Sequence, residues 1–566
     1  MKLVVVGGVA GGASVAARVR RLQEQAQIVV FERGQHVSYS NCALPYYLGG
    51  VVEQADDLVL MTPESFRARH NLDVRTCCEV TAIDRAGKTV TVRDSRTGAV
   101  YQEPYDKLVL SPGASPILPR SIAGIDRENV FSIRNVTDIV RIKSYLDRDG
   151  VSNVVVVGGG FIGIEAAENI KSAGKNVAVI EGMQQILAPF DHDMVQYLHK
   201  ELMDHGVALH LGSTLTAIED GFVRATRDGQ EFTVAADAVI MAIGVAPETK
   251  LAADAGLEIG ASRGIKVNDC FQTTDPDIYA VGDAIEAFSR LTGSAGRLAL
   301  AGPAQRQARI AADHICGISS AYKGFIGSSC IRVFGLNAAS TGLNERSAAA
   351  AGIAFDSVLV FPTDKVGLMP GSNYLAFKLL FAIPSGKLLG AQAIGAGEAD
   401  KRVNMIAALL SMNANLSDLI NMEHCYAPLF STAKDAVHMA ALVAENLLTG
   451  RMRQVHVDQV RGLVESGAYI VDVRNPDEYA AGHIIGAHNI PLPELRQRLD
   501  EIPRDIPVYL HCRSSQRSYY AYRCLVGNGY DNVVNISGSF LGISLYEYFT
   551  DRQTGRKPIV TDYNFA

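Results

Sequence analysis

Two strand–glycine turn–helix units constrain the fold of this 566-residue chain more than any other feature. The first is KLVVVGGVAGG at residues 2–12, and the second is NVVVVGGGFIGIEAAENI at residues 153–170. Each begins with a Val-rich run typical of a buried parallel strand and continues into a helix of small residues. Because parallel strands need crossover connections, usually helices, both units predict parallel α/β sheets. The length predicts several domains, since single cores stop growing at about 250–300 residues.

An acidic residue follows each unit at the end of the next predicted strand. Glu32 ends QIVVFE, and Glu181 ends NVAVIE. An acid about 20 residues after such a turn can hydrogen-bond a ribose hydroxyl of a dinucleotide. The second glycine fingerprint is complete, whereas Val9 replaces the middle glycine of the first. Because Glu181 would repel a 2′-phosphate, the second unit favours NADH over NADPH.

Composition narrows the class of protein and its compartment. The net charge of −7 gives no support for nucleic-acid binding. The nine cysteines are scattered, with no C-x-x-C pair, which is typical of a reducing cytoplasm and not of a disulfide framework. No apolar run reaches the roughly 18 residues needed to span a bilayer, and no His/Cys cluster suggests a metal. The sequence predicts a cytoplasmic protein without membrane, metal or nucleic-acid partners.

Two further stretches complete the pattern of a known superfamily. TTDPDIYAVGDAIE carries Gly282-Asp283 after a short predicted strand, and VIMAIGVAPET carries Gly244 and Pro247. With these motifs in order, residues 1–446 resemble the pyridine nucleotide–disulfide oxidoreductases. The resemblance implies an FAD domain interrupted by an NAD domain and followed by a dimerisation domain. The boundaries that follow are 1–122 and 246–322 for the two parts of the FAD domain, 123–245 for the NAD domain and 323–446 for the dimerisation domain.

The resemblance also implies two dinucleotide sites. The residues expected to bind FAD lie in the first glycine turn and at strand ends: Gly7, Val9, Ala10, Gly11, Glu32, Arg33, Ser40, Val80, Gly113, Asp283 and Gly302. The residues expected to bind NADH surround the second turn: Gly158, Gly160, Phe161, Gly163, Glu181 and Gly244.

A solitary cysteine, Cys42, lies in SYSNCALPYY at residues 38–47. The two-cysteine members of the superfamily carry a second cysteine five positions on, where this chain has Tyr47. The resemblance is therefore to the single-cysteine branch. In such a protein the thiol cycles either through a sulfenic acid, as in a peroxidase or oxidase, or through a mixed disulfide with a small thiol substrate.

The first glycine loop favours the mixed disulfide. The peroxidases of the family carry a histidine there, whereas this loop has Ala10. SYSNCALPYY also resembles the active-site stretch of coenzyme A disulfide reductases. Arginines on the helix after the first turn present guanidinium groups that suit the phosphates of coenzyme A. The residues that this resemblance assigns to coenzyme A are Ser14, Arg18, Arg21, Ser38, Asn41 and Arg69.

The dimerisation domain carries a second resemblance to those reductases. CYAPLFSTAKDAV at residues 425–437 resembles the segment that reaches the partner subunit's active site. Tyr426 would there donate to a developing thiolate, and Lys434 would assist substrate binding. A second tyrosine of the family is missing, because Leu368-Met369 precedes the Pro-Gly at that place. Since a missing donor costs ~3 kcal/mol, this departure favours a persulfide, whose leaving hydrosulfide is small, over a disulfide of coenzyme A.

Residues 455–550 form a separate pattern. VYLHCRSSQRSYYAYRCL takes a predicted strand into Cys512, a short loop and a helix, with Arg513 and Arg517 on either side. Loop amides and a helix N-terminus form an anion cradle, which lowers a thiol's pKa. The stretch resembles a rhodanese loop that carries a persulfide, with Ser515 in place of the usual glycine. A phosphatase loop needs its arginine six residues after the cysteine, whereas Arg517 is five after Cys512.

The remaining seven cysteines lack the spacing of metal ligands and are expected to pack in cores. They are Cys77, Cys78, Cys270, Cys316, Cys330, Cys425 and Cys524.

The predicted fold class is α/β, with two Rossmann-like domains, an α+β dimerisation domain and an α/β rhodanese domain. The predicted function is reduction of coenzyme A persulfide or polysulfide by NADH through FAD and Cys42, with Cys512 supplying sulfane sulfur, in a homodimer. A coenzyme A disulfide reductase is the main alternative. An NADH oxidase or peroxidase and a redox-sensing binding protein are the others.

Overall fold

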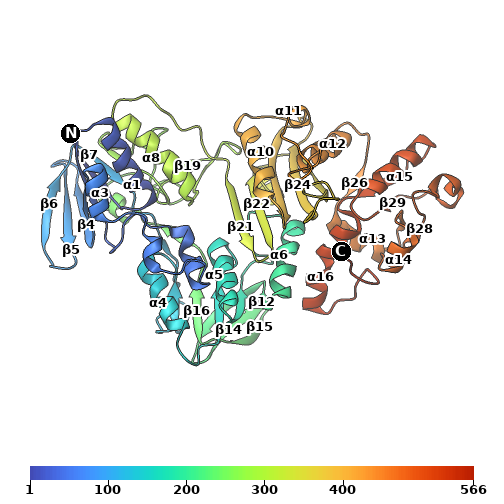
Figure 1. Ribbon diagram of the computed structural model, residues 1–566, viewed down its shortest axis with the longest axis horizontal. Coiled ribbons are helices and arrows are strands. Elements are labelled where there is room, and N and C mark those ends of the chain that lie inside the picture. The colour runs from blue at the N-terminus through green and yellow to red at the C-terminus, as the bar shows by residue number, and fades with distance from the viewer. Residues whose placement is uncertain (566) are drawn as a thin grey trace. The chain divides into compact units, whose positions relative to one another are not determined.

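The structure, a computed structural model, describes residues 1–565 (Figure 1). The chain divides into two compact units, Met1–Gln184 with Val207–Phe325 and Gln185–Gly206 with Ile326 onward. Among the described residues, no helix is long and apolar enough to cross a membrane.

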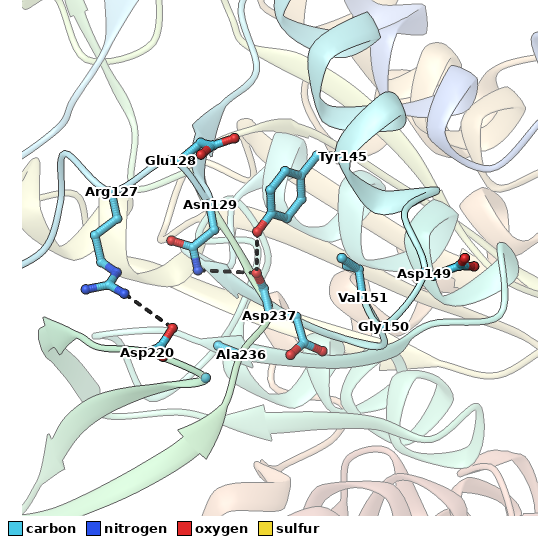
Figure 2. A pocket seen from close by; sticks show the side chains of 11 residues that line it. Arg127, Glu128, Asn129, Tyr145, Asp149, Gly150, Val151, Asp220, Ala236 and Asp237 are labelled. Atoms are coloured by element: carbon cyan, nitrogen blue, oxygen red, sulfur yellow. Dashed lines mark hydrogen bonds and ion pairs between the residues drawn. The ribbon is translucent and has the colours of Figure 1, made fainter.

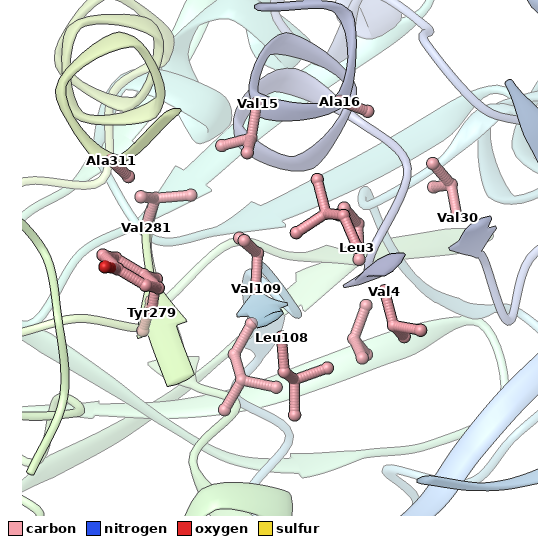
Figure 3. Packing of buried hydrophobic residues seen from close by; sticks show 14 of the residues in the cluster. Leu3, Val4, Val15, Ala16, Val30, Leu108, Val109, Tyr279, Val281 and Ala311 are labelled. Atoms are coloured by element: carbon pink, nitrogen blue, oxygen red, sulfur yellow. The ribbon is translucent and has the colours of Figure 1, made fainter. Parts of the chain in front are cut away.

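The first glycine unit lies at the centre of a five-stranded parallel sheet. The strands, in order across the sheet, are β18 (Ile278–Ala280), β7 (Lys107–Leu110), β1 (Lys2–Val6), β2 (Gln27–Phe31) and β3 (Asp73–Arg75). Helices α1 (Ala10–Leu22) and α8 (Ala301–Ile315) pack together on one face. Figure 3 shows Val15, Ala16 and Ala311 of these helices against the strands. A parallel sheet is covered on both faces, which explains the Val-rich run.

The rest of the FAD-type part consists of short elements around this sheet. They are α2 (Leu44–Leu48), α3 (Pro63–His70), β4 (Cys78–Asp84), β5 (Thr89–Asp94), β6 (Val100–Pro104), α7 (Lys250–Asp254), β19 (Ala287–Phe288) and β20 (Ala295–Gly296), with 3-10 turns at Asn41–Ala43 and Ala55–Leu58. Strands β4, β5 and β6 pair antiparallel in a sheet of their own.

The second glycine unit lies at the centre of another five-stranded parallel sheet. The strands, in order, are β12 (Val207–His210), β11 (Asn176–Ile180), β10 (Asn153–Val157), β16 (Ala238–Met241) and β9 (Val130–Ser132). The accompanying elements are α4 (Val136–Leu146), α5 (Phe161–Ser172), the antiparallel strands β13 (Ser213–Ile218), β14 (Phe222–Arg227) and β15 (Gln230–Ala235), and the pair β8 (Ala114–Pro116) and β17 (Val245–Pro247).

The second compact unit, which contains residues from Ile326 onward, includes a five-stranded antiparallel sheet. Its strands, in order, are β21 (Ser328–Val333), β22 (Leu336–Gly342), β25 (Leu388–Gly395), β24 (Leu375–Ala382) and β23 (Phe355–Val360). Its helices are α9 (Glu345–Ala350), α10 (Ala399–Ser411), α11 (Leu416–Asn421) and α12 (Ala436–Leu448).

The C-terminal part is a five-stranded parallel sheet with helices. Its strands, in order, are β26 (Gln454–Val455), β30 (Val533–Ile536), β29 (Val508–His511), β27 (Tyr469–Asp472) and β28 (His488–Asn489). Its helices are α13 (Val460–Glu465), α14 (Pro476–Ala480), α15 (Gln516–Gly527) and α16 (Ser539–Thr554), with 3-10 turns at Val457–Gln459, Leu495–Gln497 and Leu499–Glu501. The predicted fold class is confirmed.

Helix α6 (His192–Asp204) groups with the second unit, although it lies within the span 123–245 predicted for the NAD domain. It packs against α16 of the C-terminal part. The ring of His199 lies 4.7 Å from that of Phe549, and the ring of His192 lies 5.6 Å from that of Tyr546. The second unit therefore joins an element from the middle of the chain to its C-terminal helix.

Candidate active site

The first glycine turn has the backbone that a dinucleotide needs. Gly7 adopts φ +96, and a Cβ on it would lie 2.1 Å from the carbonyl oxygen of Ser111. A Cβ on Gly12 would lie 1.9 Å from the carbonyl oxygen of Gly7, so the helix α1 can approach only without a side chain there. Val9 caps α1 without a side-chain hydrogen bond, which leaves the first amides of the helix available to an anion.

Two of the residues predicted to bind FAD, Glu32 and Asp283, follow parallel strands of the first sheet at their carboxyl ends. Glu32 at the end of β2 accepts hydrogen bonds from the amides of Gly8 (2.9 Å) and Gly34 (2.8 Å), which fixes its carboxylate. Asp283 follows β18, and burial raises its pKa. This edge is where open α/β sheets bind ligands. Arg33 forms an ion pair with Glu248, with Nη2 and Oε1 2.8 Å apart, and Val80 packs in the core. The turn and carboxylate fit FAD.

The second glycine turn is built in the same way. Gly158 adopts φ +111, and a Cβ on Gly163 would lie 2.0 Å from the carbonyl oxygen of Gly158. The space around a Cβ on Gly160, the N-cap of α5, is open. Glu181 accepts from the amides of Gly159 (2.5 Å) and Met183 (2.7 Å), so its carboxylate lies beside the turn. These residues fit a nicotinamide dinucleotide with an unmodified ribose.

Cys42 lies in a 3-10 turn, Asn41–Ala43, directly before α2. The stretch is tied to the first glycine turn, because the amide of Ser38 donates to the carbonyl oxygen of Gly8 (2.9 Å). Ser38 holds φ +46, in the left-handed region. Cys42 is exposed, and partial burial with the charges of Glu165 and Asp283 raises the pKa of its thiol. The stretch that carries the thiol is therefore joined to the first glycine turn.

Glu165 is a site residue that sequence reasoning missed. It lies on α5, two residues after Gly163, and α5 packs against α2. Burial, with a smaller effect of Glu168, raises its pKa to about 7. A carboxyl with that pKa can hold a proton near neutral pH, and its charge acts on the Cys42 thiol. The sequence feature that could have identified Glu165 is an acidic residue in the first two turns of a helix that otherwise has mostly small and apolar residues.

The arginines assigned to coenzyme A differ in their surroundings. Arg18 forms an ion pair with Asp313, with Nη2 2.8 Å from Oδ1, so its charge is balanced. Arg21 and Arg69 are both exposed. The buried Arg20 donates to the carbonyl oxygens of His70 and Asn71 (each 2.9 Å), which joins the last turns of α1 and α3. Arg20, which the sequence did not single out, thus holds the two helix ends that carry Arg21 and Arg69.

The segment with Tyr426 and Lys434 has no regular structure, and both side chains are exposed, Tyr426 to 48%. The amide of Val366 donates to the carbonyl oxygen of Pro428 (3.3 Å), so the segment is joined to the neighbouring loop. Leu368, at the place of the missing tyrosine, is on that loop and 78% exposed. The departure from the family pattern therefore lies next to the Tyr426 segment.

Cys512 follows β29 and is 1% exposed. Its amide donates to Oγ of Ser539 (3.2 Å). Ser515 holds φ +73, the conformation that the usual glycine adopts without cost. Its Oγ donates to the carbonyl oxygen of Ile536 (3.3 Å) and lies 3.1 Å from Oγ of Ser539. These bonds compensate for the strain and keep the loop shape.

The two loop arginines have partners. Arg517 forms a two-bond ion pair with Glu478, with distances of 2.6 and 2.7 Å, which lowers the pKa of that carboxyl. Nη1 of Arg513 donates to Oδ1 of Asn564 in the C-terminal segment (3.3 Å). Arg517 therefore closes the loop onto α14, while Arg513 extends along the other side.

The expectation that the other seven cysteines pack in cores is wrong for two of them. Cys330 and Cys425 are exposed, whereas Cys78 is buried. Cys425 lies in the exposed, irregular segment before Tyr426, and Cys330 lies on the edge strand β21. Apolar character alone did not reveal either environment.

A cavity of about 560 Å³ lies away from these residues (Figure 2). It is formed where strands β9, β10 and β16 begin, opposite the edge that carries the second glycine turn. Asn129 and Tyr145 both donate to the carbonyl oxygen of Asp237 there. None of the predicted site residues lines it.

The sequence matches the pyridine nucleotide-disulphide oxidoreductase family over residues 1–308, more than half of the chain. The chain belongs to this family. It also matches the family's dimerisation domain over residues 329–437 and a rhodanese-like domain over residues 456–545. It is therefore an oxidoreductase of this family, and its dinucleotide turns are consistent with FAD and NADH.

Named relatives share most of the chain. The coenzyme A disulfide reductase of Staphylococcus haemolyticus is 31% identical over 447 residues, covering 79% of this chain and all of that protein. The reduced CoADR-RHD of Bacillus anthracis is 42% identical, with a TM-score of 0.93, over 97% of this chain and 98% of that one. A NAD-dependent persulfide reductase from A. fulgidus is 33% identical, with a TM-score of 0.89, over 95% and 99%.

Proposed function

We propose that this protein is an NADH-dependent flavoenzyme that reduces the persulfide of coenzyme A and releases sulfide. The observation that carries the proposal is the pairing, in one chain, of a solitary thiol beside a dinucleotide turn with a rhodanese-type cysteine loop. The persulfide reductase and the CoADR-RHD named above support it, since both align over nearly the whole chain.

Cys42 is the proposed catalytic nucleophile. Its thiolate attacks the coenzyme A sulfur of the persulfide, the S–S bond breaks, and hydrosulfide leaves. The product is a mixed disulfide between Cys42 and coenzyme A. FAD, which the first glycine turn and Glu32 would hold, would supply the electron pair from NADH that cleaves this mixed disulfide. Glu165 can give the proton that the departing thiolate of coenzyme A takes up, because its pKa of about 7 keeps part of it protonated at neutral pH.

The substrate residues divide between two regions. Arg21 and Arg69, held together by Arg20, would bind phosphates of coenzyme A, while Ser14, Ser38 and Asn41 would contact the rest of the molecule. Because Arg18 is paired with Asp313, it contributes less charge than Arg21 or Arg69. Tyr426 and Lys434 would act in the partner subunit of a homodimer, consistent with the dimerisation domain.

Cys512 would take sulfane sulfur from a donor and pass it to coenzyme A. The loop amides, the first turn of α15 and the nearby arginines provide positive potential for a persulfide. The nine free cysteines, with no disulfide, suit a reducing compartment such as the cytoplasm.

The test is steady-state NADH oxidation with coenzyme A persulfide and, separately, coenzyme A disulfide, with sulfide measured. We expect kcat/KM to be higher for the persulfide, with one sulfide released per NADH. Equal or better turnover of the disulfide would favour the second candidate function, a coenzyme A disulfide reductase. The absence of a tyrosine at Leu368-Met369 is the observation against that candidate.

A further inference from the structure

Two buried hydrogen-bond donors lie near each other beside the Cys512 loop and lack an acceptor. They are the hydroxyl of Tyr197 on α6 and Nη2 of Arg513, the residue after Cys512. Among residues 1–565, neither atom has a hydrogen-bond partner. Burial raises the pKa of Tyr197 far above its ordinary value, and Arg513 is the charged group that acts on it. The pair is thus a neutral phenol and a cation.

The surroundings hold both groups in place. The carbonyl oxygen of Arg513 accepts from the amide of Leu541 (3.1 Å), and Nη1 donates to Asn564 (3.3 Å). The Tyr197 ring lies 6.1 Å from that of Phe361. Phe361 in turn borders the N-terminus of α16, because a Cβ on its N-cap Gly538 would lie 3.6 Å from the Phe361 ring, and that end of α16 contacts the loop through the amide of Phe540, which donates to the carbonyl oxygen of Cys512 (3.0 Å). Tyr197 therefore belongs to the wall around the loop that follows Cys512.

A buried donor without an acceptor costs roughly 1–3 kcal/mol, and two adjacent ones are unusual in a native fold. Arginine cannot accept a hydrogen bond, and a phenol of high pKa acts as a neutral donor. A ligand that these two donors bind is therefore a hydrogen-bond acceptor, and the Arg513 cation favours one with negative charge. Lys200 on α6 forms an ion pair with Asp204, and His199 on the same helix has its pKa lowered to about 3 by burial and stays neutral. It neither repels nor attracts an anion at neutral pH.

We propose that Tyr197 and Arg513 form a subsite for the anionic end of a sulfane-sulfur donor that reacts with Cys512. Tyr197 is a binding residue of the sulfur-transfer site, although it lies in the stretch of chain assigned to the NAD domain. This inference rests on the proposed sulfur-transfer role of Cys512. The shared ligand chemistry is a small anion with an S–S bond, as in thiosulfate or an inorganic polysulfide.

The transfer balances without an added reductant. The Cys512 thiolate attacks the sulfane sulfur of the donor, and a new S–S bond forms to that sulfur. The donor's own S–S bond breaks, and its electron pair leaves on the remaining fragment. That fragment is sulfite from thiosulfate, or a polysulfide one sulfur shorter. Arg513 and Tyr197 would bind this fragment while negative charge builds up on it in the transition state. Hydrogen-bond donors lower the activation barrier most at such a developing charge.

The first test measures sulfur transfer by the full-length holoenzyme to cyanide, with thiosulfate in one arm and sodium tetrasulfide in the other. Tyr197→Phe keeps the ring and removes the hydroxyl. We expect kcat/KM to fall about tenfold, because hydrogen bonds to charged groups are worth more than neutral ones. A fall in both arms shows that the shared anionic end is bound, and a fall in one arm identifies the donor. Unchanged constants in both arms would overturn the proposal.

A matched control is Tyr548→Phe. Tyr548 lies on α16, and its ring packs 5.1 Å from those of Tyr563 and Phe565. Its loss of a hydroxyl should leave transfer at the wild-type level. A fall equal to that of Tyr197→Phe would mean that α16 packing, and not the subsite, controls transfer, and the proposal would then be wrong.

A second measurement needs no turnover. Sulfite, which carries no sulfane sulfur, should slow alkylation of Cys512 by iodoacetamide, followed on the Cys512 peptide by mass spectrometry. Tyr197→Phe should raise the sulfite concentration for half-protection about tenfold. If wild-type protein transfers no sulfur through Cys512, the proposed function fails, yet this shift would still support the subsite. Equal protection in both proteins would mean that ordered water satisfies the two donors.

Discussion

Arg402 and Asp435 form a fully buried ion pair, with Nη2 2.9 Å from Oδ2, beneath the segment that carries Tyr426. The same Nη2 donates to the carbonyl oxygen of Asp364 (2.6 Å), near the start of the loop with Leu368. One guanidinium therefore joins the two loops that the family resemblance places at the partner's active site.

Replacing Arg402 by Met would leave the Asp435 carboxylate buried and unpaired. Such a loss costs about 3–5 kcal/mol, so we expect a lower midpoint of thermal unfolding and weaker NADH-dependent turnover. Differential scanning calorimetry and steady-state kinetics measure both effects. Lys401→Met on the same helix, which removes a partly exposed pair with Glu398, is the control and should change neither by much. An Arg402→Met protein as stable as the wild type would contradict this role.

Burial raises the pKa of the Cys42 thiol, and the charge of Glu165 raises it further. Glu165→Gln removes that charge, so the pKa of the Cys42 thiol should fall. The rate of alkylation of the Cys42 peptide against pH measures it. Glu168→Gln is the matched control: because Glu168 raises the pKa of Glu165, its loss leaves Glu165 more fully charged and should not lower the pKa of Cys42. A Cys42 titration unchanged in Glu165→Gln would refute the coupling.

Glu165 also predicts a pH dependence of stability. Its pKa is about 7 in the fold against 4.5 in the unfolded chain, so the folded state binds the proton more tightly. Its contribution to stability is therefore fully present below pH 4.5 and is lost as pH rises through about 7. Glu165→Gln, which does not titrate, should gain stability relative to the wild type over that interval. Urea unfolding at several pH values tests the sign, and a difference that stays constant with pH would count against it.

Serine variants of Cys42 and Cys512 should lose activity toward different sets of substrates. Cys42→Ser should abolish NADH-linked sulfide release from every sulfur substrate. Cys512→Ser should still reduce preformed coenzyme A persulfide. It should no longer reduce polysulfide when coenzyme A is present only in small, substoichiometric amounts. Sulfide release measured with both substrates decides the matter. Equal losses for the two substrates in Cys512→Ser would end the proposed division of labour.

Ser515 allows a test of how the rhodanese loop tolerates the absence of glycine. Ser515→Gly removes the cost of φ +73 but loses the two Oγ contacts, so stability should change by less than about 1 kcal/mol. Ser515→Ala keeps the strain and loses the contacts, and should destabilise by about 1–2 kcal/mol. Thermal unfolding of the full chain compares them. An Ala variant as stable as the Gly variant would show that the Oγ contacts contribute nothing.

The loop at Leu368-Met369 predicts substrate preference. Met369→Tyr restores a phenol directly before the Pro-Gly, where the coenzyme A disulfide reductases carry one. If the missing donor limits disulfide turnover, the variant should reduce coenzyme A disulfide faster, by roughly tenfold in kcat/KM, while persulfide turnover changes less. Met412→Tyr, at an exposed methionine outside this loop, serves as the control. No gain with the disulfide would show that the preference is set elsewhere.

The sequence predicted the parts of the fold that short patterns specify. The two glycine turns, the acids Glu32 and Glu181 and the loop of Cys512 all lie where strand–turn–helix geometry puts them. What it did not predict depends on contacts between distant segments: the pairing of Arg18 with Asp313, the position of Glu165 beside Cys42 and the pairing of Arg517 with Glu478. Spacing along the chain does not determine which charge meets which partner.

The packing of helix α6 against α16 limits where this chain can be cut into separately expressed fragments. A fragment that begins at residue 455 would carry α16 away from α6 and leave the rings of Tyr546 and Phe549 without their covering partners. Such a fragment would aggregate more readily than free-standing homologues and would lack Tyr197. The boundary of the rhodanese-like sequence match therefore differs from the boundary of the packed structure. A fragment of this chain made for sulfur transfer has to include α6, which is encoded some 250 codons upstream of residue 455.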